Sequence, residues 1–306
     1  MIRFILKRLV QIIPVIIGVS LVVFLIMQMV PGDPAAVLAG EGASKETVEQ
    51  YREDLGLNRP VVVQYFSYIT NVFQGDLGHS LKNNQPVLDE ILLRLPITIE
   101  LAFYSILVTI VLGMLAGIIS AVKPYSLTDI GVTIISLLGI SLPSFWMGLL
   151  FMYVFSVKLQ WLPVAGWDSV AHMILPAFTL GIGGAAIVAR MTRSSMMDVV
   201  GQDYIRTARA KGLRESVIIS KHALRNALIP VITVVGLQFG SLLGGTVLIE
   251  SVFAINGLGR MIVDSIRTRD IPMVQGGVLV ASLIFVFVNL LVDVLYRVFN
   301  KRIDLN

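Results

Sequence analysis

The sequence contains no cysteine and only three histidines among its 306 residues. Without cysteine there is no disulfide framework, no thiolate nucleophile and no cysteine-based metal site. Charged residues make up only 14% of the chain, against roughly 25% in soluble proteins. Charge this sparse does not cover the surface of an ordinary soluble globule, and the composition also excludes disorder, collagen and coiled coil.

Several catalytic and nucleotide-binding motifs are missing as well. There is no G-x-x-x-x-G-K-[ST] phosphate loop, so this chain is not expected to bind ATP by that route. No H-E-x-x-H pair, G-x-S-x-G elbow or G-x-G-D sequence occurs, and His79, His172 and His222 are far apart in the sequence. The chain is therefore predicted to bind no cofactor or metal and not to be an enzyme.

Long apolar runs are what the sequence does contain, with 56% apolar residues and a mean hydropathy of +0.82. A helix needs about 20 mostly apolar residues to cross a bilayer. Six stretches qualify: Leu9–Val30, Ile97–Val122, Gly131–Val157, Val170–Ala189, Ile229–Ile249 and Gly276–Tyr296. They predict an all-α polytopic membrane protein with six transmembrane helices. The first run of 22 residues follows Arg3, Lys7 and Arg8 and is too long for a cleaved signal peptide, so we interpret it as a retained anchor.

The distribution of charge predicts the orientation. With a cytoplasmic N-terminus, the inner segments hold 15 Lys and Arg with 5 acidic residues, and the outer segments hold 9 with 14. Such a cytoplasmic excess of Lys and Arg is typical of membrane proteins. Both termini are thus predicted to be cytoplasmic, and the basic balance reflects topology rather than nucleic-acid binding.

The outer segment, residues 31–96, is predicted to form short helices. Ser44 caps a helix that runs to Leu55 with Gly56 past its end, Pro60 occupies the first turn before Val61–Phe73, and Pro86 opens Val87–Leu95. The segment is interpreted as a small helical cap on the first spans. A docking surface for an external partner is a compatible alternative.

The inner segment Arg190–Leu228 contains a short helix with clear start and stop signals. Asp203 can accept hydrogen bonds from the first N–H groups, Arg209 and Lys211 suit the last turn, and Gly212 suits a left-handed C-terminal residue. Such a helix is only about 12 Å long and must be packed against something to be stable. The segment is either a basic surface on anionic lipid or a rigid knob for a cytoplasmic partner.

Small and polar residues mark several spans. Glycines repeat every four residues at Gly113–Gly117 and Gly236–Gly240–Gly244, a spacing that lets helix backbones approach closely, within the chain or at a dimer seam. The third span is expected to break at Ser141-Leu142-Pro143-Ser144. The candidates for a polar translocation path are Ser141, Pro143, Ser144, Gln238 and Ser241. Local repair of backbone hydrogen bonds at a proline kink is the alternative explanation.

Ionisable residues near the middle of the spans are almost missing. Glu100 and Asp293 lie near span ends, where snorkelling or interfacial pairing accounts for them. This scarcity argues against a proton- or sodium-coupled carrier, which remains the alternative from another class. A membrane-anchored assembly or sensor module is a third hypothesis.

Five motifs together carry a resemblance to a known family. They are Arg8-Leu9 with Pro31-Gly32-Asp33-Pro34, Gly75-Asp76-Leu77-Gly78-His79-Ser80, Asp203 to Leu213, His222 to Pro230, and Gly257-Leu258-Gly259-Arg260. The chain resembles, over essentially its whole length, the B-type permease subunit of bacterial dipeptide, oligopeptide, glutathione and nickel importers of the ATP-binding-cassette (ABC) class.

The resemblance implies a role for the short inner helix. It is similar to the importer coupling motif, whose helix docks into a groove on the nucleotide-binding subunit. The implied coupling residues are Asp203, Tyr204, Arg206, Ala208, Arg209, Lys211 and Gly212. The general motif begins with Glu-Ala-Ala, whereas Arg206-Thr207-Ala208 stands here. This departure leaves Arg206, Arg209 and Lys211 as candidates for the salt bridge to the partner.

The resemblance also implies the assembly and the fold. The expected fold is a type I importer permease, with residues 1–30 as tail and first helix, 31–96 as extracytoplasmic helical region and 97–306 as permease core. The expected partners are a homologous second permease, two ABC ATPase subunits that bind ATP and Mg, an extracytoplasmic binding protein and membrane lipid, with no nucleic acid. The expected location is the bacterial cytoplasmic (inner) membrane. Di- and oligopeptides are the expected substrates, with glutathione, nickel or a metal–chelator complex as alternatives.

Overall fold

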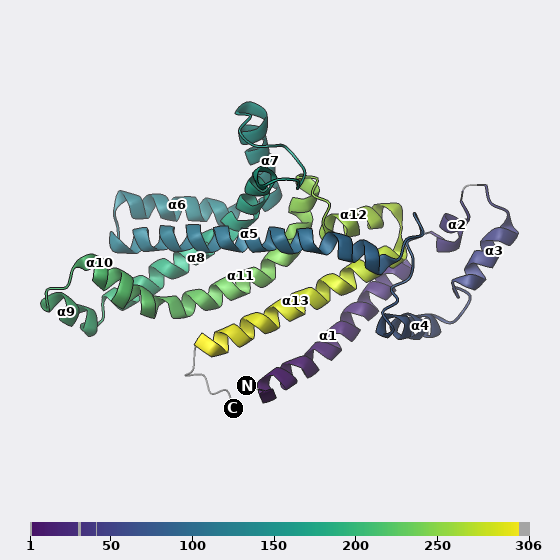
Figure 1. Cartoon of the computed structure of the whole chain (residues 1–306), viewed down its shortest axis with the longest axis horizontal. Helices are drawn as coiled ribbons and strands as arrows, with labels where there is room; N and C mark the ends of the chain where they lie inside the picture. Colours follow the sequence, from purple (N-terminus) through teal and green to yellow (C-terminus); the bar gives the residue numbers. More distant parts are fainter. Residues whose placement is uncertain (1, 30–31, 41, 300–306) are drawn as a thin grey trace. The chain divides into compact units, whose positions relative to one another are not determined.

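The computed structural model describes residues 2–29, 32–40 and 42–299, which form helices joined by short connections (Figure 1). Within these ranges there is no β-strand, only an isolated bridge between His79 and Pro86. The expected all-α class is confirmed. The chain divides into a first unit, residues 1–98 with 256–287, and a second unit, residues 99–255 with 288–306.

Among the described residues, five helices are long and apolar enough to cross a membrane. They are α1 (Ile2–Met29), α5 (Val87–Val122), α8 (Val170–Val200), α11 (Leu224–Val252) and α13 (Ile271–Phe299). A further pair consists of α6 (Leu127–Ser141) and α7 (Ser144–Phe151), which continues as the π-helix η1 (Met152–Lys158). This pair is bent by 109° between Ser141 and Ser144, so the predicted break within the third span is confirmed. The described chain has six spans only if the bent pair counts as one.

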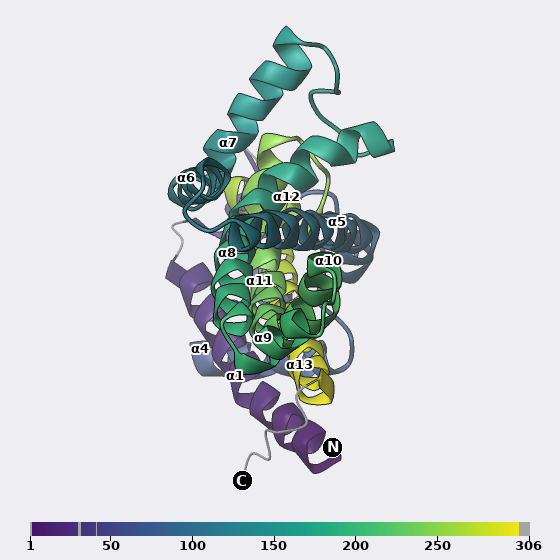
Figure 2. The same cartoon turned by 90° about the vertical axis from the view of Figure 1, so that its left-hand side faces the viewer.

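The bend lies at the predicted break and has a local cause. A residue that precedes proline is disfavoured in the helical region, because the proline ring clashes with its backbone. Leu142, before Pro143, accordingly adopts extended angles, with φ −87° and ψ 134°. Figure 2 shows that α7 and η1 run in a different direction from α6.

The first unit contains α1, the start of α5, the first part of α13 and four shorter helices. These are α2 (Pro34–Ala39), α3 (Lys45–Asp54), α4 (Val61–Phe73) and α12 (Leu258–Thr268). Its core is formed by buried side chains of Val87, Ile91, Leu258, Met261 and Met273. The start of α5 and α13 approach closely, because a Cβ atom at Gly276 would lie 2.6 Å from Val87 Cγ1.

The start signals predicted for the short helices are largely confirmed. The Ser44 hydroxyl accepts a hydrogen bond from Thr47 N at 3.1 Å and caps α3. Pro60 lies at the N-cap of α4, one position before the expected first turn. The separate helix Val87–Leu95 is wrong, because α5 runs on through Pro96 to Val122. A proline inside a membrane helix is tolerated where neighbouring groups satisfy the freed carbonyl.

In the second unit, α8 packs against α5, α6, α7 and α11. The glycines predicted for close approach line its contact with α5. A Cβ atom at Gly113 would lie 2.8 Å from Ala185 O, and one at Gly117 would lie 2.6 Å from Ala189 O. Any side chain there would overlap the backbone of α8, so the predicted role of these two glycines is confirmed.

The three glycines of α11 that were predicted to allow close helix approach differ in their surroundings. Gly236 lies against Val292, and a Cβ atom at Gly240 would lie 2.8 Å from Asn289 Oδ1, so both face α13 within the second unit. Around Gly244, by contrast, no atom of the described chain lies within 4 Å of a Cβ position. Close packing of the third glycine is therefore not seen within this chain.

The segment 190–228 is mostly helical rather than a loop. The helix α8 continues to Val200, eleven residues beyond the predicted end at Ala189. The remaining elements are α9 (Asp203–Ala210), α10 (Glu215–Val217), the π-helix η2 (Ile218–Ala223) and the start of α11. In Figure 1 α9 and α10 lie together at the end of the second unit, beside the ends of α8 and α11.

Candidate functional site

The short helix α9 begins one residue earlier than its predicted cap requires. Its N-cap is Gln202, which makes no side-chain capping bond, and Asp203 is the first helical residue. The prediction that Asp203 accepts bonds from the first N–H groups is therefore wrong. Its side chain is almost fully exposed and lies 3.5 Å from Arg206 Nη1. A negative charge in the first turn still interacts favourably with the helix dipole.

The end of α9 follows the prediction. Lys211 is the C-cap residue, and Gly212 has a φ of +75°, which is the left-handed conformation expected of it. Gly212 N donates to Arg209 O at 2.9 Å and closes the last turn. Open space surrounds Gly212 among the described residues, so only its backbone conformation disfavours a side chain.

One face of α9 is buried, as a helix of this length requires. Ile205 is fully buried and Ala208 is 7% exposed. They pack in an apolar cluster, here called the α9 cluster, which is completed by Ala121, Met196, Ile218, Ala223 and Ala227. The Tyr204 hydroxyl also accepts a hydrogen bond from Asn226 Nδ2 at 2.7 Å. The segment therefore supplies its own packing, and the helix is held on α8, η2, α11 and the end of α5.

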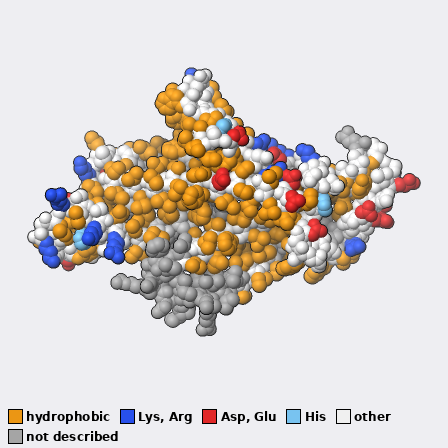
Figure 3. Space-filling model, viewed as in Figure 1, with side chains coloured by type: hydrophobic (Ala, Val, Ile, Leu, Met, Phe, Trp, Pro, Cys, Tyr) orange, Lys and Arg blue, Asp and Glu red, His pale blue; other side chains and the backbone are white. Residues whose placement is uncertain are grey.

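The other face of α9 is exposed and basic. Figure 3 shows Lys and Arg side chains gathered over α9 and α10, whereas the neighbouring α5 and α6 show mainly hydrophobic side chains. Arg209 is bound by the Glu215 carboxylate at 2.6 and 3.2 Å, and this hydrogen bonding raises the pKa of Arg209 above its ordinary value. Arg206 is 75% exposed, and Lys211 forms no ion pair among the described residues. These two cations are thus better placed than Arg209 for an external carboxylate.

An ion pair that the sequence did not reveal joins α8 to the start of α6. Arg193 of α8 donates from Nε and Nη2 to both oxygens of Asp129, each at 2.7 Å. The same carboxylate accepts from Tyr125 N at 2.8 Å and from the Ser120 hydroxyl. The Asp129 side chain is only 4% exposed. The turn between α5 and α6 is thereby held on α8, ten residues before α9 begins.

The translocation-path candidates fall into two groups, one at the bend between α6 and α7 and one on α11. Ser141 and Pro143 are exposed at the bend, and Ser144 lines a cavity of about 190 Å³ with Thr179 and Gly183. The second group lies at α11. Gln238 Nε2 lies 3.2 Å from the Cβ position of Gly184, and the exposed Ser241 donates to Gln238 O at 2.8 Å. The only proline of α11 is Pro230, so the Ser241 bond is an ordinary side-chain bond to the helix backbone and does not repair a proline kink.

Acidic residues of the spans behave in two ways. Glu100 accepts a hydrogen bond from Trp167 Nε1 at 3.1 Å, which is the interfacial pairing expected for a span end. Glu250, by contrast, is fully buried near the end of α11. No group of three or more His, Cys, Asp or Glu side chains suited to a metal ion occurs among the described residues.

Two of the resemblance motifs turn out to hold the first unit together. Asp33 caps α2 through Ala35 N at 3.0 Å and forms an ion pair with Arg52 at 2.5 Å. Asp270, which is 3% exposed, accepts hydrogen bonds from the Ser80 hydroxyl and from Leu81 N. Pro31 and the side chain of Arg8, which belong to the same motif as Asp33, lie outside the described residues.

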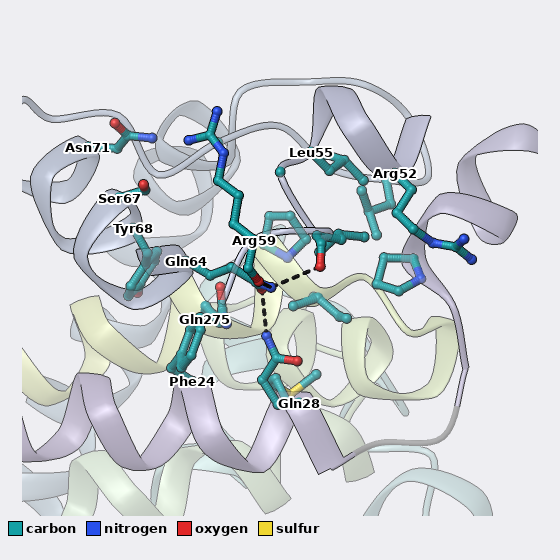
Figure 4. A pocket seen from close by; sticks show the side chains of 18 of the residues that line it. Phe24, Gln28, Arg52, Leu55, Arg59, Gln64, Ser67, Tyr68, Asn71 and Gln275 are labelled. Carbon is teal, nitrogen blue, oxygen red and sulfur yellow. Dashed lines mark hydrogen bonds between the residues drawn. The ribbon is translucent and has the colours of Figure 1, made fainter. Parts of the chain in front are cut away.

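The first unit also contains a cavity of about 560 Å³ that sequence reasoning missed (Figure 4). Its lining comes from α1, α3, α4, the start of α13 and the connections between them. Figure 4 shows the amides of Gln28, Gln64 and Gln275 close together, with Phe24 and Tyr68 beside them. No local pattern points to it, because its residues are spread over some 250 positions of the chain.

The chain matches two known families of sequence. Residues 113–305 match "Binding-protein-dependent transport system inner membrane component", and residues 1–102 match the N-terminal part of such membrane components. The chain is 48% identical over 304 residues to a protein named "Glutathione transport system permease protein GsiC" from Pectobacterium atrosepticum, covering 99% of both chains. It is also 48% identical over 303 residues to the protein of that name from Escherichia coli K12, again with 99% coverage of both.

Solved structures share the fold at lower sequence identity. A structure of the MetNI methionine ABC transporter in an inward-facing conformation matches with a TM-score of 0.57 at 20% identity, covering 69% of this chain and 96% of that chain. A crystal structure of an amino acid ABC transporter with histidines matches with a TM-score of 0.53 at 16% identity, covering 70% and 94%. These matches support the predicted importer permease fold.

Proposed function

Because this chain belongs to the family of binding-protein-dependent transport system inner membrane components, it is a permease subunit of an ABC importer, and we propose that it imports glutathione and related short peptides. The observation that carries the substrate class is the 48% identity, over 99% of both chains, to permeases named for glutathione transport. The sequence motifs resemble peptide-type permeases in general, and glutathione is itself a tripeptide. Nickel and metal–chelator complexes have less support.

We infer that α9 is the coupling helix, which docks into a groove on an ABC ATPase subunit. Its exposed, basic face and its closed C-terminal turn support this assignment, and the excess of Lys and Arg in residues 190–228 favours a cytoplasmic position. Arg206 and Lys211 would meet carboxylates of the partner. ATP and Mg belong to the partner ATPases, and this chain contributes neither phosphate loop nor hydrolysis.

The mechanical role of α9 depends on how firmly it is attached. The α9 cluster joins it to α8, α11 and the end of α5, and the Arg193–Asp129 pair ties the α5–α6 turn to the same helix α8. A push on α9 is thus passed to three long helices through packed side chains rather than through a flexible loop. Closure of two ATPases would move the coupling helices of two homologous permeases together, and the spans would switch as rigid bodies between inward- and outward-facing arrangements.

Uptake by the reconstituted assembly tests the proposal. The four cytoplasmic-membrane subunits would be placed in proteoliposomes with the binding protein encoded beside them, and uptake of labelled glutathione, dialanine and nickel would be compared with and without ATP. We expect ATP-dependent uptake of glutathione, or of short peptides including it. Uptake that follows an ion gradient without ATP would identify a secondary carrier instead and overturn the proposal.

A further inference from the structure

The cavity of the first unit has the size and the lining of a small-molecule site. Its volume of about 560 Å³ falls within the roughly 300–1,000 Å³ that is usual for such sites. Its apolar wall includes Phe24, which is 5% exposed, and Met27, which is 7% exposed. The Tyr68 ring stacks on Phe24 with centroids 6.3 Å apart, and burial raises the pKa of Tyr68 to about 12. The phenol is therefore neutral at physiological pH.

The amides in the cavity are held in a fixed arrangement. Gln64 Nε2 donates to Leu57 O at 3.0 Å and to Arg59 O at 2.8 Å, and Gln28 Nε2 donates to Gln64 Oε1 at 2.9 Å. All of the usual hydrogen-bonding capacity of the Gln64 amide nitrogen is thus used within the chain. The Gln28 carbonyl oxygen and the Gln275 amide remain directed at the cavity, where they suit a peptide group (Figure 4).

The charged residues of the lining differ in whether they already form ion pairs within the chain. Arg52 is bound by Asp33 and Glu49, each at 2.5 Å. Arg59 forms no ion pair among the described residues, and Figure 4 shows its side chain extending from the amide cluster toward Ser67 and Asn71. Asp76 accepts from Gly78 N at 2.8 Å through Oδ1 only, which leaves Oδ2 for a ligand. One cation and one anion therefore remain for external partners.

We propose that this cavity is a binding site for a zwitterionic short peptide, with the ligand carboxylate at Arg59 and its ammonium group at Asp76. The two charged side chains of the lining that form no ion pair among the described residues match the two ends of such a ligand. The amides of Gln28 and Gln275 bind its backbone, and the wall around Phe24 receives its apolar parts. Arg is suited to the carboxylate, because its planar guanidinium can form two parallel hydrogen bonds. The peptide class rests on the proposed function, whereas the site rests on the cavity itself.

Equilibrium binding to the complete permease assembly in nanodiscs, without the binding protein, tests this site. The probes are labelled glutathione and N-acetylglutathione, which lacks the ammonium group. We expect Arg59→Gln to weaken binding of both probes by about 10-fold or more, because a charge-assisted hydrogen bond is lost. Asp76→Asn should weaken glutathione only, because it removes the partner of the ammonium group. Lys45→Gln, an exposed cation at the start of α3 outside the cavity lining, is the matched control.

The outcomes separate this site from the proposed function. If the wild-type assembly takes up glutathione but Arg59→Gln and Asp76→Asn bind both probes like the control, the site is overturned while the function stands. If the wild-type assembly transports no peptide, the function fails independently. Ser67→Trp, which fills the cavity from its exposed rim, gives a second measurement: binding that survives this change also overturns the site.

Discussion

Replacing Ile205 by Ala should loosen α9, the proposed coupling helix, without altering the surface that it offers to a partner. Ile205 is fully buried in the α9 cluster, and α9 is too short to persist without that packing. The change removes three carbon groups, each contributing about 0.8 kcal/mol when buried, so the transfer loss is roughly 2.4 kcal/mol. Any cavity left behind adds to this, and Ile→Ala changes in cores cost about 2–5 kcal/mol.

Hydrogen exchange of the segment that contains α9 measures this loss directly. A local destabilisation of roughly 2.4 kcal/mol corresponds to about 50-fold faster exchange of amides that open with α9, since each 1.4 kcal/mol is a factor of ten. In the reconstituted assembly, uptake per ATP hydrolysed should fall, because a loosened helix passes less of the ATPase motion to α8. Thr207→Ala is the matched control for the exchange measurement, because Thr207 is an exposed residue of α9 outside the α9 cluster.

Two outcomes would each refute one step of this reasoning. If Ile205→Ala exchanges no faster than Thr207→Ala over residues 203–213, the α9 cluster does not hold the helix. If exchange rises as expected but uptake per ATP is unchanged, the cluster holds the helix and the transmission argument is wrong.

Three further predictions concern other contacts. Gly212→Val should strain the left-handed turn at the end of α9 by about 1–2 kcal/mol. We expect this variant to be expressed normally and to hydrolyse ATP without matching uptake. Normal uptake would exclude α9 as the coupling helix. Arg193→Gln should lower the uptake per ATP hydrolysed. Arg193→Lys should give a value between that variant and the wild type, because lysine cannot bind both Asp129 oxygens. Equal uptake per ATP in the wild type and the two variants would contradict this. Gly117→Ala should lower the thermal unfolding midpoint of the purified chain, whereas Gly244→Ala should leave that midpoint unchanged or raise it. A higher midpoint for Gly117→Ala than for Gly244→Ala would disprove the close contact between Gly117 and α8.

Local signals predicted local structure well. The Ser44 cap, the turn at Gly212 and the break before Pro143 each depend on one residue and its immediate neighbours. Asp203 was misplaced by one position. The carbonyl oxygen of Gln202 already accepts hydrogen bonds from Ile205 N and Arg206 N, so Gln202 is the N-cap of α9. Close approach at Gly113 and Gly117 was predicted from spacing, but the partner helix was not.

The sequence by itself determined the membrane class, the number and approximate place of the apolar runs and the presence of a capped helix in residues 190–228, because bilayer burial and capping act over one run or one turn. The tertiary structure alone decided the angle of the bend, which is 109°, the Arg193–Asp129 pair and the cavity of the first unit. Arg193 and Asp129 are 64 residues apart, and Ser80 and Asp270 are 190 apart. Contacts of that range depend on how helices pack, which no periodicity within a single helix encodes.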